Sequence, residues 1–72
     1  MKLKINGKVI TIEVSDESFL LEDLITHLGY QAQVVVVELN GTIINSEDWF
    51  TTKIKDGDCL EVVTIVGGGS YS

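Results

Sequence analysis

Few residues of this 72-residue chain combine a reactive side chain with a partner at a useful spacing. His27 has no cysteine or histidine at ligand spacing, which favours an ordinary helix-end residue over a metal ligand. Cys59 has no adjacent cation that would stabilise a thiolate, so we expect a half-buried packing residue. Asp56-Gly57-Asp58 lacks the remaining acidic ligands of a calcium loop, which predicts a turn. These residues predict neither a metal site nor an active site.

The carboxyl-terminal end carries the most distinctive pattern, which is the run of glycines at Gly67, Gly68 and Gly69. Because glycine has no Cβ, such a segment could thread a narrow channel and lie close to a nucleotide. The same composition, followed by Ser70, is also typical of a flexible linker or a disordered end. On the glycines alone, both interpretations stay open.

Composition restricts the chain to one small globular domain, since 44% of its residues are hydrophobic and they are spread along its length. A core this small cannot spare side chains to line a substrate pocket, so we do not expect an enzyme. The net charge of −6 would repel a phosphate backbone, which disfavours a nucleic-acid partner. An acidic surface instead suits docking onto basic patches of partner proteins, although it could equally serve only solubility.

Cysteine usage and the amino-terminal sequence indicate a compartment. The single cysteine cannot form an internal disulfide, which fits a reducing environment. The first residues, MKLKING, lack the apolar core of a signal peptide, and the longest apolar run, residues 34–37, is too short to cross a bilayer. We therefore expect a soluble, cytoplasmic protein without a membrane partner.

Two runs of alternating apolar and polar residues open the chain, at residues 1–6 and 8–14. Asn6-Gly7 lies between them, and both residues tolerate the positive φ of a tight hairpin turn. Leu21, Leu24, Ile25 and Leu28 then recur at helical spacing. We expect a helix of about three turns there, with N-cap candidates at residues 15–18 and Gly29 as the stop.

The second half of the chain reads as three more strands. Residues 33–39 are rich in β-branched side chains and end at Asn40-Gly41, after which residues 42–44 form a short strand. A brief turn or helix from Ser46 carries Trp49 and Phe50, which we expect to close the core. Residues 59–66 form the last strand.

The predicted fold is therefore α+β, with a five-stranded sheet packed on one helix. Residues 1–66 form the domain, and residues 67–72 form a flexible carboxyl-terminal tail. The apolar faces of these elements predict a shared core of Leu3, Ile5, Ile10, Ile12, Leu21, Leu24, Ile25, Leu28 and Leu60.

The last strand carries apolar residues on both faces near its end. If one helix covers a single face, Val63 and Ile65 lie on the exposed face and could dock a partner. If the strand is central and partly covered on both faces, they belong to the packing instead. The pattern supports both interpretations equally.

The order of elements, with the ending DGDCLEVVTIVGGG, resembles the bacterial sulfur-carrier family of thiamine thiazole synthesis. The segment VVVVELNGTIINSEDWFTTKIKDGDCLEVV is also similar to that family, and the resemblance covers residues 1–69. It implies a ubiquitin-like β-grasp fold with a mixed sheet. It also implies that Gly67 and Gly68 thread the tail into a partner and that Gly69 carries sulfur as a thiocarboxylate.

The resemblance further implies a set of partners. A ubiquitin-activating-like enzyme would adenylate the terminal carboxylate with its own ATP and magnesium, so the carrier binds no cofactor. A cysteine desulfurase or another persulfide donor would supply sulfur, and thiazole synthase would take it. The carrier would be a monomer when free.

One feature departs from the family pattern. Ser70-Tyr71-Ser72 follows Gly69 and makes its carbonyl an amide. Either a peptidase trims these three residues, or they are an artefact, or the protein has left the carrier role. The masked tails of ubiquitin-like proteins and some sulfur carriers favour trimming. Carriers for molybdopterin, cysteine or methionine synthesis, and ubiquitin-like protein modifiers, share the same tail chemistry. The sequence leaves these alternatives open.

Overall fold

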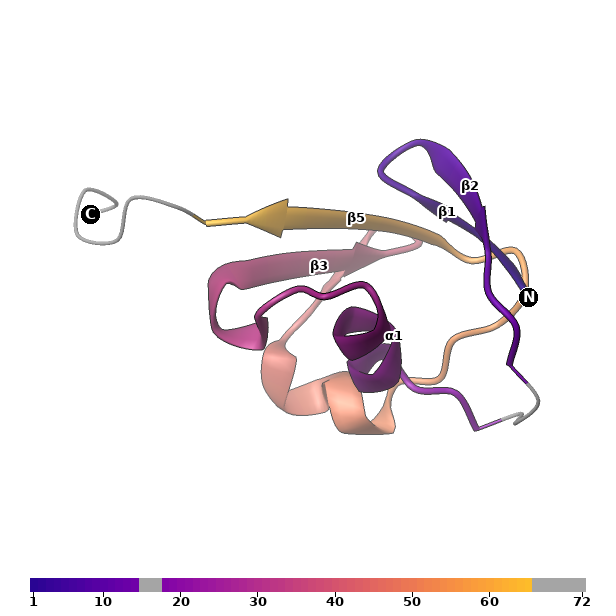
Figure 1. Cartoon of the computed structure of the whole chain (residues 1–72). Coiled ribbons are helices and arrows are strands. Elements are labelled where there is room, and N and C mark those ends of the chain that lie inside the picture. Colours follow the sequence, from indigo (N-terminus) through magenta and orange to yellow (C-terminus); the bar gives the residue numbers. More distant parts are fainter. Residues whose placement is uncertain (15–17, 66–72) are drawn as a thin grey trace.

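In the computed structural model, which describes residues 1–14 and 18–65, the chain begins with the predicted antiparallel hairpin (Figure 1). Strand β1 covers Lys2–Ile5 and β2 covers Lys8–Thr11, with Leu3 opposite Ile10. Asn6 and Gly7 have φ values of 52° and 84°, as a tight turn between twisted strands requires. Both strands are shorter than expected, although Met1 and Ile12 still exchange backbone hydrogen bonds of 2.8 and 2.9 Å beyond the assigned ends.

Helix α1 spans Leu21–His27 and buries the predicted apolar stripe. Its seven residues make about two turns rather than three. The expected N-caps at 15–18 are wrong, because Leu20 occupies the N-cap position and pairs with Lys53 in an isolated bridge. Residues 15–17 lie outside the described residues. The N–H of Leu20 donates to the Asp23 carboxylate at 3.1 Å.

Gly29 stops the helix as predicted, with a φ of 84°. Its N–H donates to the Thr26 carbonyl at 3.1 Å, and the N–H of Tyr30 donates to the Ile25 carbonyl at 3.2 Å. This pair of bonds is the Schellman arrangement, which satisfies carbonyls that the last helical turn leaves open.

The remaining elements follow the predicted order, with shifted bounds. A 3₁₀ turn, η1 (Ala32–Val34), precedes β3 (Val35–Leu39), and β4 (Thr42–Ile44) follows the Asn40-Gly41 turn. A second 3₁₀ segment, η2, spans Ser46–Thr51, and β5 spans Cys59–Thr64. Residue 66, the expected end of the last strand, lies outside the described residues.

The strands form one mixed sheet in the order β2-β1-β5-β3-β4. Strand β5 is central, since it runs parallel to β1 and antiparallel to β3. In Figure 1, α1 and the segment containing η2 lie on the same side of the sheet. This arrangement confirms the α+β prediction of a five-stranded mixed sheet packed on one helix.

The core lies between the sheet and α1. Trp49 is only 2% exposed, and its Nε1–H donates to the Ile44 carbonyl at 3.0 Å. Phe50, expected beside it in the core, is 60% exposed because consecutive residues of η2 face different sides. Ile10 and Leu28 are partly rather than fully buried. The buried residues are Leu3, Ile5, Ile12, Leu21, Leu24, Ile25, Val35, Val37, Trp49, Ile54, Leu60 and Val62.

Candidate functional site

The tail residues Gly67, Gly68 and Gly69 lie outside the described residues, so the candidate site is described from the strand that leads to them. Strand β5 alternates in burial along its length. Leu60 and Val62 face the core, whereas Glu61 and Val63 face the other side of the sheet and are exposed. The end of β5 therefore contributes buried side chains to the core on one face of the sheet and exposed side chains to the surface on the other.

The open side of the sheet carries an apolar pair beside the end of β5. Val63 is 58% exposed and lies opposite Val36 of β3, which is also exposed. Ile65 is partly buried, and its N–H donates to the Val34 carbonyl at 2.6 Å. Of the two interpretations that the sequence left open, the exposed face therefore holds for Val63, whereas Ile65 is only partly accessible. Among the described residues, no helix covers this side of β5, although the strand is central (Figure 1).

Two carboxylates adjoin this apolar pair. Glu61 of β5 and Glu38 of β3 are register partners, so their side chains project from the same face of the sheet. Like charges directly opposite each other destabilise a strand pair, and a cation from a binding partner would relieve their repulsion. The sequence offered no signal for this pair, because the two residues lie 23 positions apart (61 − 38) and meet only through the β3–β5 register.

The other candidate residues do not join this site as reactive groups. His27 is the exposed last residue of α1. Cys59 is exposed rather than half-buried, because it begins β5 on the open side of the sheet. Asp56 and Asp58 accept bonds from the N–H groups of Lys2 (2.6 Å) and Lys55 (2.8 Å), which confirms a structural turn.

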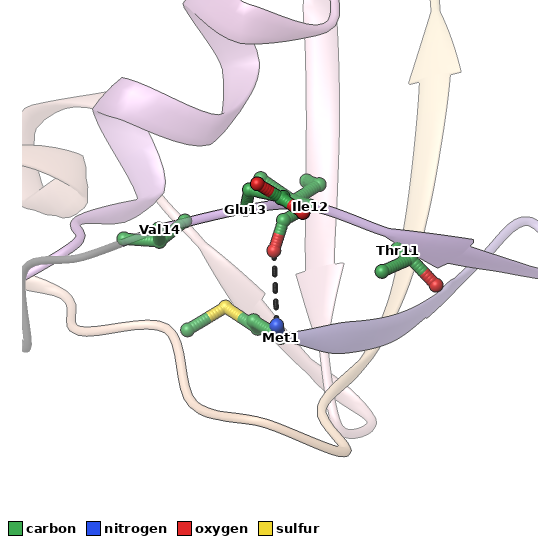
Figure 2. Close-up of a pocket in the computed structure, with 5 residues that line it drawn as sticks. All are labelled: Met1, Thr11, Ile12, Glu13 and Val14. Carbon is green, nitrogen blue, oxygen red and sulfur yellow. Dashed lines mark hydrogen bonds between the residues drawn. The ribbon is translucent and has the colours of Figure 1, made fainter.

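A shallow hollow lies beside the start of the chain, lined by Met1 and by residues 11–14 (Figure 2). The amino-terminal ammonium group donates to the Ile12 carbonyl at 2.9 Å, which ties Met1 to the segment after β2. Glu13 is the only ionisable side chain among the lining residues. The lining thus provides one carboxylate and an ammonium group that is already bonded to the Ile12 carbonyl, which does not by itself indicate acid–base or nucleophilic chemistry.

Over residues 1–14 and 18–65, no three His, Cys, Asp or Glu side chains gather closely enough to hold a metal ion. In the same part of the chain, no helix has the length and apolar character needed to span a membrane.

Comparisons with known proteins agree with the fold. The model of the ThiS family matches residues 3–69. A crystal structure of the thiamine biosynthesis protein (ThiS) from Geobacter metallireducens superposes with a TM-score of 0.80 at 40% identity, covering 96% of this chain and 100% of that one. That match confirms the ubiquitin-like β-grasp fold.

Two curated proteins extend the comparison. The sulfur carrier protein ThiS of Bacillus subtilis is 31% identical, over 93% of this chain and 98% of its own length. A thiazole synthase of Paramagnetospirillum magneticum (strain ATCC 700264 / AMB-1) is 37% identical over 97% of this chain. This chain spans only 21% of that enzyme, so the similarity concerns one segment of a larger protein.

Proposed function

The chain belongs to the ThiS family, and we propose that it carries sulfur on the carboxyl group of Gly69 for the thiazole of thiamine. The observation that carries the proposal is the family match, which includes Gly67 and Gly68 and ends at Gly69. We place the domain at residues 1–66 and the tail at residues 67–72. In this role the chain is a protein substrate rather than an enzyme.

The first step is exposure of the Gly69 carboxylate. A peptidase hydrolyses the bond between Gly69 and Ser70. Water supplies the second oxygen of the Gly69 carboxylate and a proton to the Ser70 amine, and Ser70-Tyr71-Ser72 leaves as a peptide. The Gly69 carboxylate then attacks the α-phosphorus of ATP on an activating enzyme, and pyrophosphate leaves with the magnesium. The product is an acyl-adenylate, a mixed anhydride with AMP as a good leaving group.

Sulfur enters from a persulfide donor such as a cysteine desulfurase. The terminal persulfide sulfur attacks the acyl carbon and AMP leaves, which forms an acyl disulfide. A second thiol cleaves that disulfide, so the donor becomes part of an ordinary disulfide and Gly69 keeps a thiocarboxylate. The similarity to a thiazole synthase segment supports thiazole synthase as the acceptor of this sulfur. We assign the reaction to the cytoplasm, as expected from the single cysteine and the amino-terminal sequence.

The proposal is tested by the intact mass of the protein isolated from its own cells. We expect a chain ending at Gly69, part of which has one sulfur in place of one oxygen. Higher-mass conjugates to other proteins would instead indicate a protein modifier. Only full-length chain ending at Ser72, under conditions that demand thiamine synthesis, would refute the carrier role.

Docking is assigned to the open side of β5, at Val63 and Ile65, with Glu61 and its register partner Glu38 next to Val63 on the same face. An apolar patch rimmed by carboxylates suits a partner surface with an apolar centre and a basic rim. The activating enzyme and thiazole synthase both need to approach the same tail. We therefore expect them to use overlapping parts of this surface.

Replacing Val63 with aspartate should weaken binding to the activating enzyme by about 2 kcal/mol, roughly 30-fold in Kd, because the new carboxylate would be desolvated at the interface. Isothermal titration calorimetry measures the change. Val9→Asp is the matched control, since Val9 is also exposed on the open side of the sheet but lies on the edge strand β2. Equal affinities for the two variants would show that this end of β5 is not the docking surface.

A further inference from the structure

Strand β5 loses its neighbour on one side before it ends. Strand β1 pairs only with its first two residues, Cys59 and Leu60, because β1 stops at the Asn6-Gly7 turn. On the other side, β3 continues to pair as far as Thr64. The last part of β5, which leads to the tail, would therefore present unpaired backbone groups on the β1 side.

The side chain of Asn6 occupies this position. Its Oδ1 accepts a hydrogen bond from the Val62 N–H at 2.7 Å, and its Nδ2 donates to the Val62 carbonyl at 3.2 Å. The backbone N–H of Asn6 also donates to the Leu60 carbonyl at 2.9 Å. One residue thus satisfies both backbone groups of Val62 and extends the ladder beyond the end of β1.

Asparagine suits this position for two reasons. Its φ of 52° lies in the left-handed region, which asparagine tolerates better than most residues with a side chain. Its amide offers an acceptor and a donor side by side, as the N–H and carbonyl of one strand residue require. An ionised aspartate could accept from the Val62 N–H but could not donate to the carbonyl.

We propose that Asn6 is a positioning residue for the tail, because its amide fixes the part of β5 from which the tail continues. The inference rests on the carrier function proposed above. When Val62 is held in the free protein, the activating enzyme receives a strand end that is already ordered. Without the amide, part of that ordering would have to occur on docking and would weaken binding.

The second Asn-Gly turn supplies a matched control. Asn40 has a φ of 50° and also contacts β5, since its Oδ1 accepts from the Cys59 N–H at 3.0 Å and its Nδ2 donates to Asp58 at 3.2 Å. These contacts lie at the start of β5, whereas those of Asn6 lie toward the tail. Asn6→Gly and Asn40→Gly each remove two side-chain bonds, and glycine accepts the positive φ in both turns.

The first measurement concerns the free protein and does not depend on any enzyme. Amide hydrogen exchange at Val62 should be about tenfold faster in Asn6→Gly than in Asn40→Gly, as the loss of about 1.4 kcal/mol of local protection predicts. Unchanged exchange at Val62 in Asn6→Gly would overturn the proposal that the Asn6 side chain holds Val62.

The second measurement uses chains that end at Gly69 and a cognate activating enzyme with ATP. The kcat/KM for adenylation should fall about tenfold in Asn6→Gly, mainly through KM, while Asn40→Gly stays within about twofold of wild type. A merely structural role would lower the melting temperature of both variants without separating their kinetics well below that temperature. Equal kcat/KM values for the two variants would overturn the proposal.

If Asn6→Gly does not fold, Asn6→Asp replaces it and Asn40→Asp becomes the control, since Asp-Gly also forms this turn. Asn6→Asp keeps the acceptor for the Val62 N–H but places a carboxylate oxygen against the Val62 carbonyl. We expect its kcat/KM to fall at least about threefold relative to Asn40→Asp. Failure of the carrier function would look different, because wild-type chain ending at Gly69 would then not be adenylated at all.

Discussion

Replacing Leu24 with alanine should lower the free energy of unfolding by about 2–5 kcal/mol, as large-to-small changes at filled core sites do. Leu24 is fully buried, at 0% exposure, on the face of α1 that packs against the sheet. A domain of this size has few other apolar contacts with which to close the cavity. Since small domains are commonly stable by about 5–15 kcal/mol, this single change would remove a large part of the total.

Urea denaturation followed by circular dichroism measures the effect, and Ile43→Ala is the control. Ile43 is an aliphatic residue on the edge strand β4 and is 63% exposed, so its truncation should change stability by less than about 0.5 kcal/mol. Equal denaturation midpoints for the two variants would mean that the apolar face of α1 has been misplaced.

Most of the fold could be predicted from local patterns in the sequence. The Asn6-Gly7 hairpin and the helix ending at Gly29 are specified by neighbouring residues, through positive φ at the turns and apolar spacing along the helix. The bounds were less predictable, because they depend on distant contacts. The helix begins at Leu21 because its N–H donates to the Thr52 carbonyl at 2.8 Å, a bond between segments about thirty residues apart in the chain.

Residues whose burial depends on a distant segment were missed. Val35 and Val37 are core residues within a continuous apolar run, where alternation cannot identify the inner face. Ile54 lies in a connecting segment without periodicity. Its N–H pairs with the Phe19 carbonyl at 2.9 Å, and its side chain is buried in the core. Trp49 and Phe50 are adjacent and similar in chemistry, so only the course of η2 decides which of them is buried.

The candidate site, like the fold, was predictable where it depends on local pattern and not where it depends on distant contacts. Alternation along the last strand gave an outward-facing Val63 as one of two open interpretations, whereas its partner Val36 and the opposed carboxylates Glu38 and Glu61 required the strand order. The contact between Asn6 and Val62 was hidden for the same reason, since 56 positions separate the two residues. From the sequence, Asn6 was only a turn residue.

Truncation of the tail should have the largest effect on function, because it creates or removes the reacting group. The chain ending at Gly69 should form an acyl-adenylate with a cognate activating enzyme and ATP. With a persulfide donor and a thiol it should then gain the mass of one sulfur in place of one oxygen. The full chain, in which the Gly69 carbonyl is an amide, should form no adenylate. Mass spectrometry of the intact protein distinguishes the products.

Two further chains identify what the enzyme recognises in the tail. A chain ending at Ser70 also has a free carboxylate, but one residue too far from the domain, so it should be adenylated poorly if Gly69 is the reacting residue.

Gly68→Val in the chain ending at Gly69 adds a branched side chain where the tail must pass close to the enzyme. It should reduce adenylation at least about 100-fold, since small displacements of a reacting group have effects of that size. Equal adenylation of the chains ending at Gly69 and Ser70 would contradict the assignment of Gly69. If no cognate activating enzyme adenylates the chain ending at Gly69, the carrier function is wrong, and the open side of β5 is better explained as the surface of a protein-binding module.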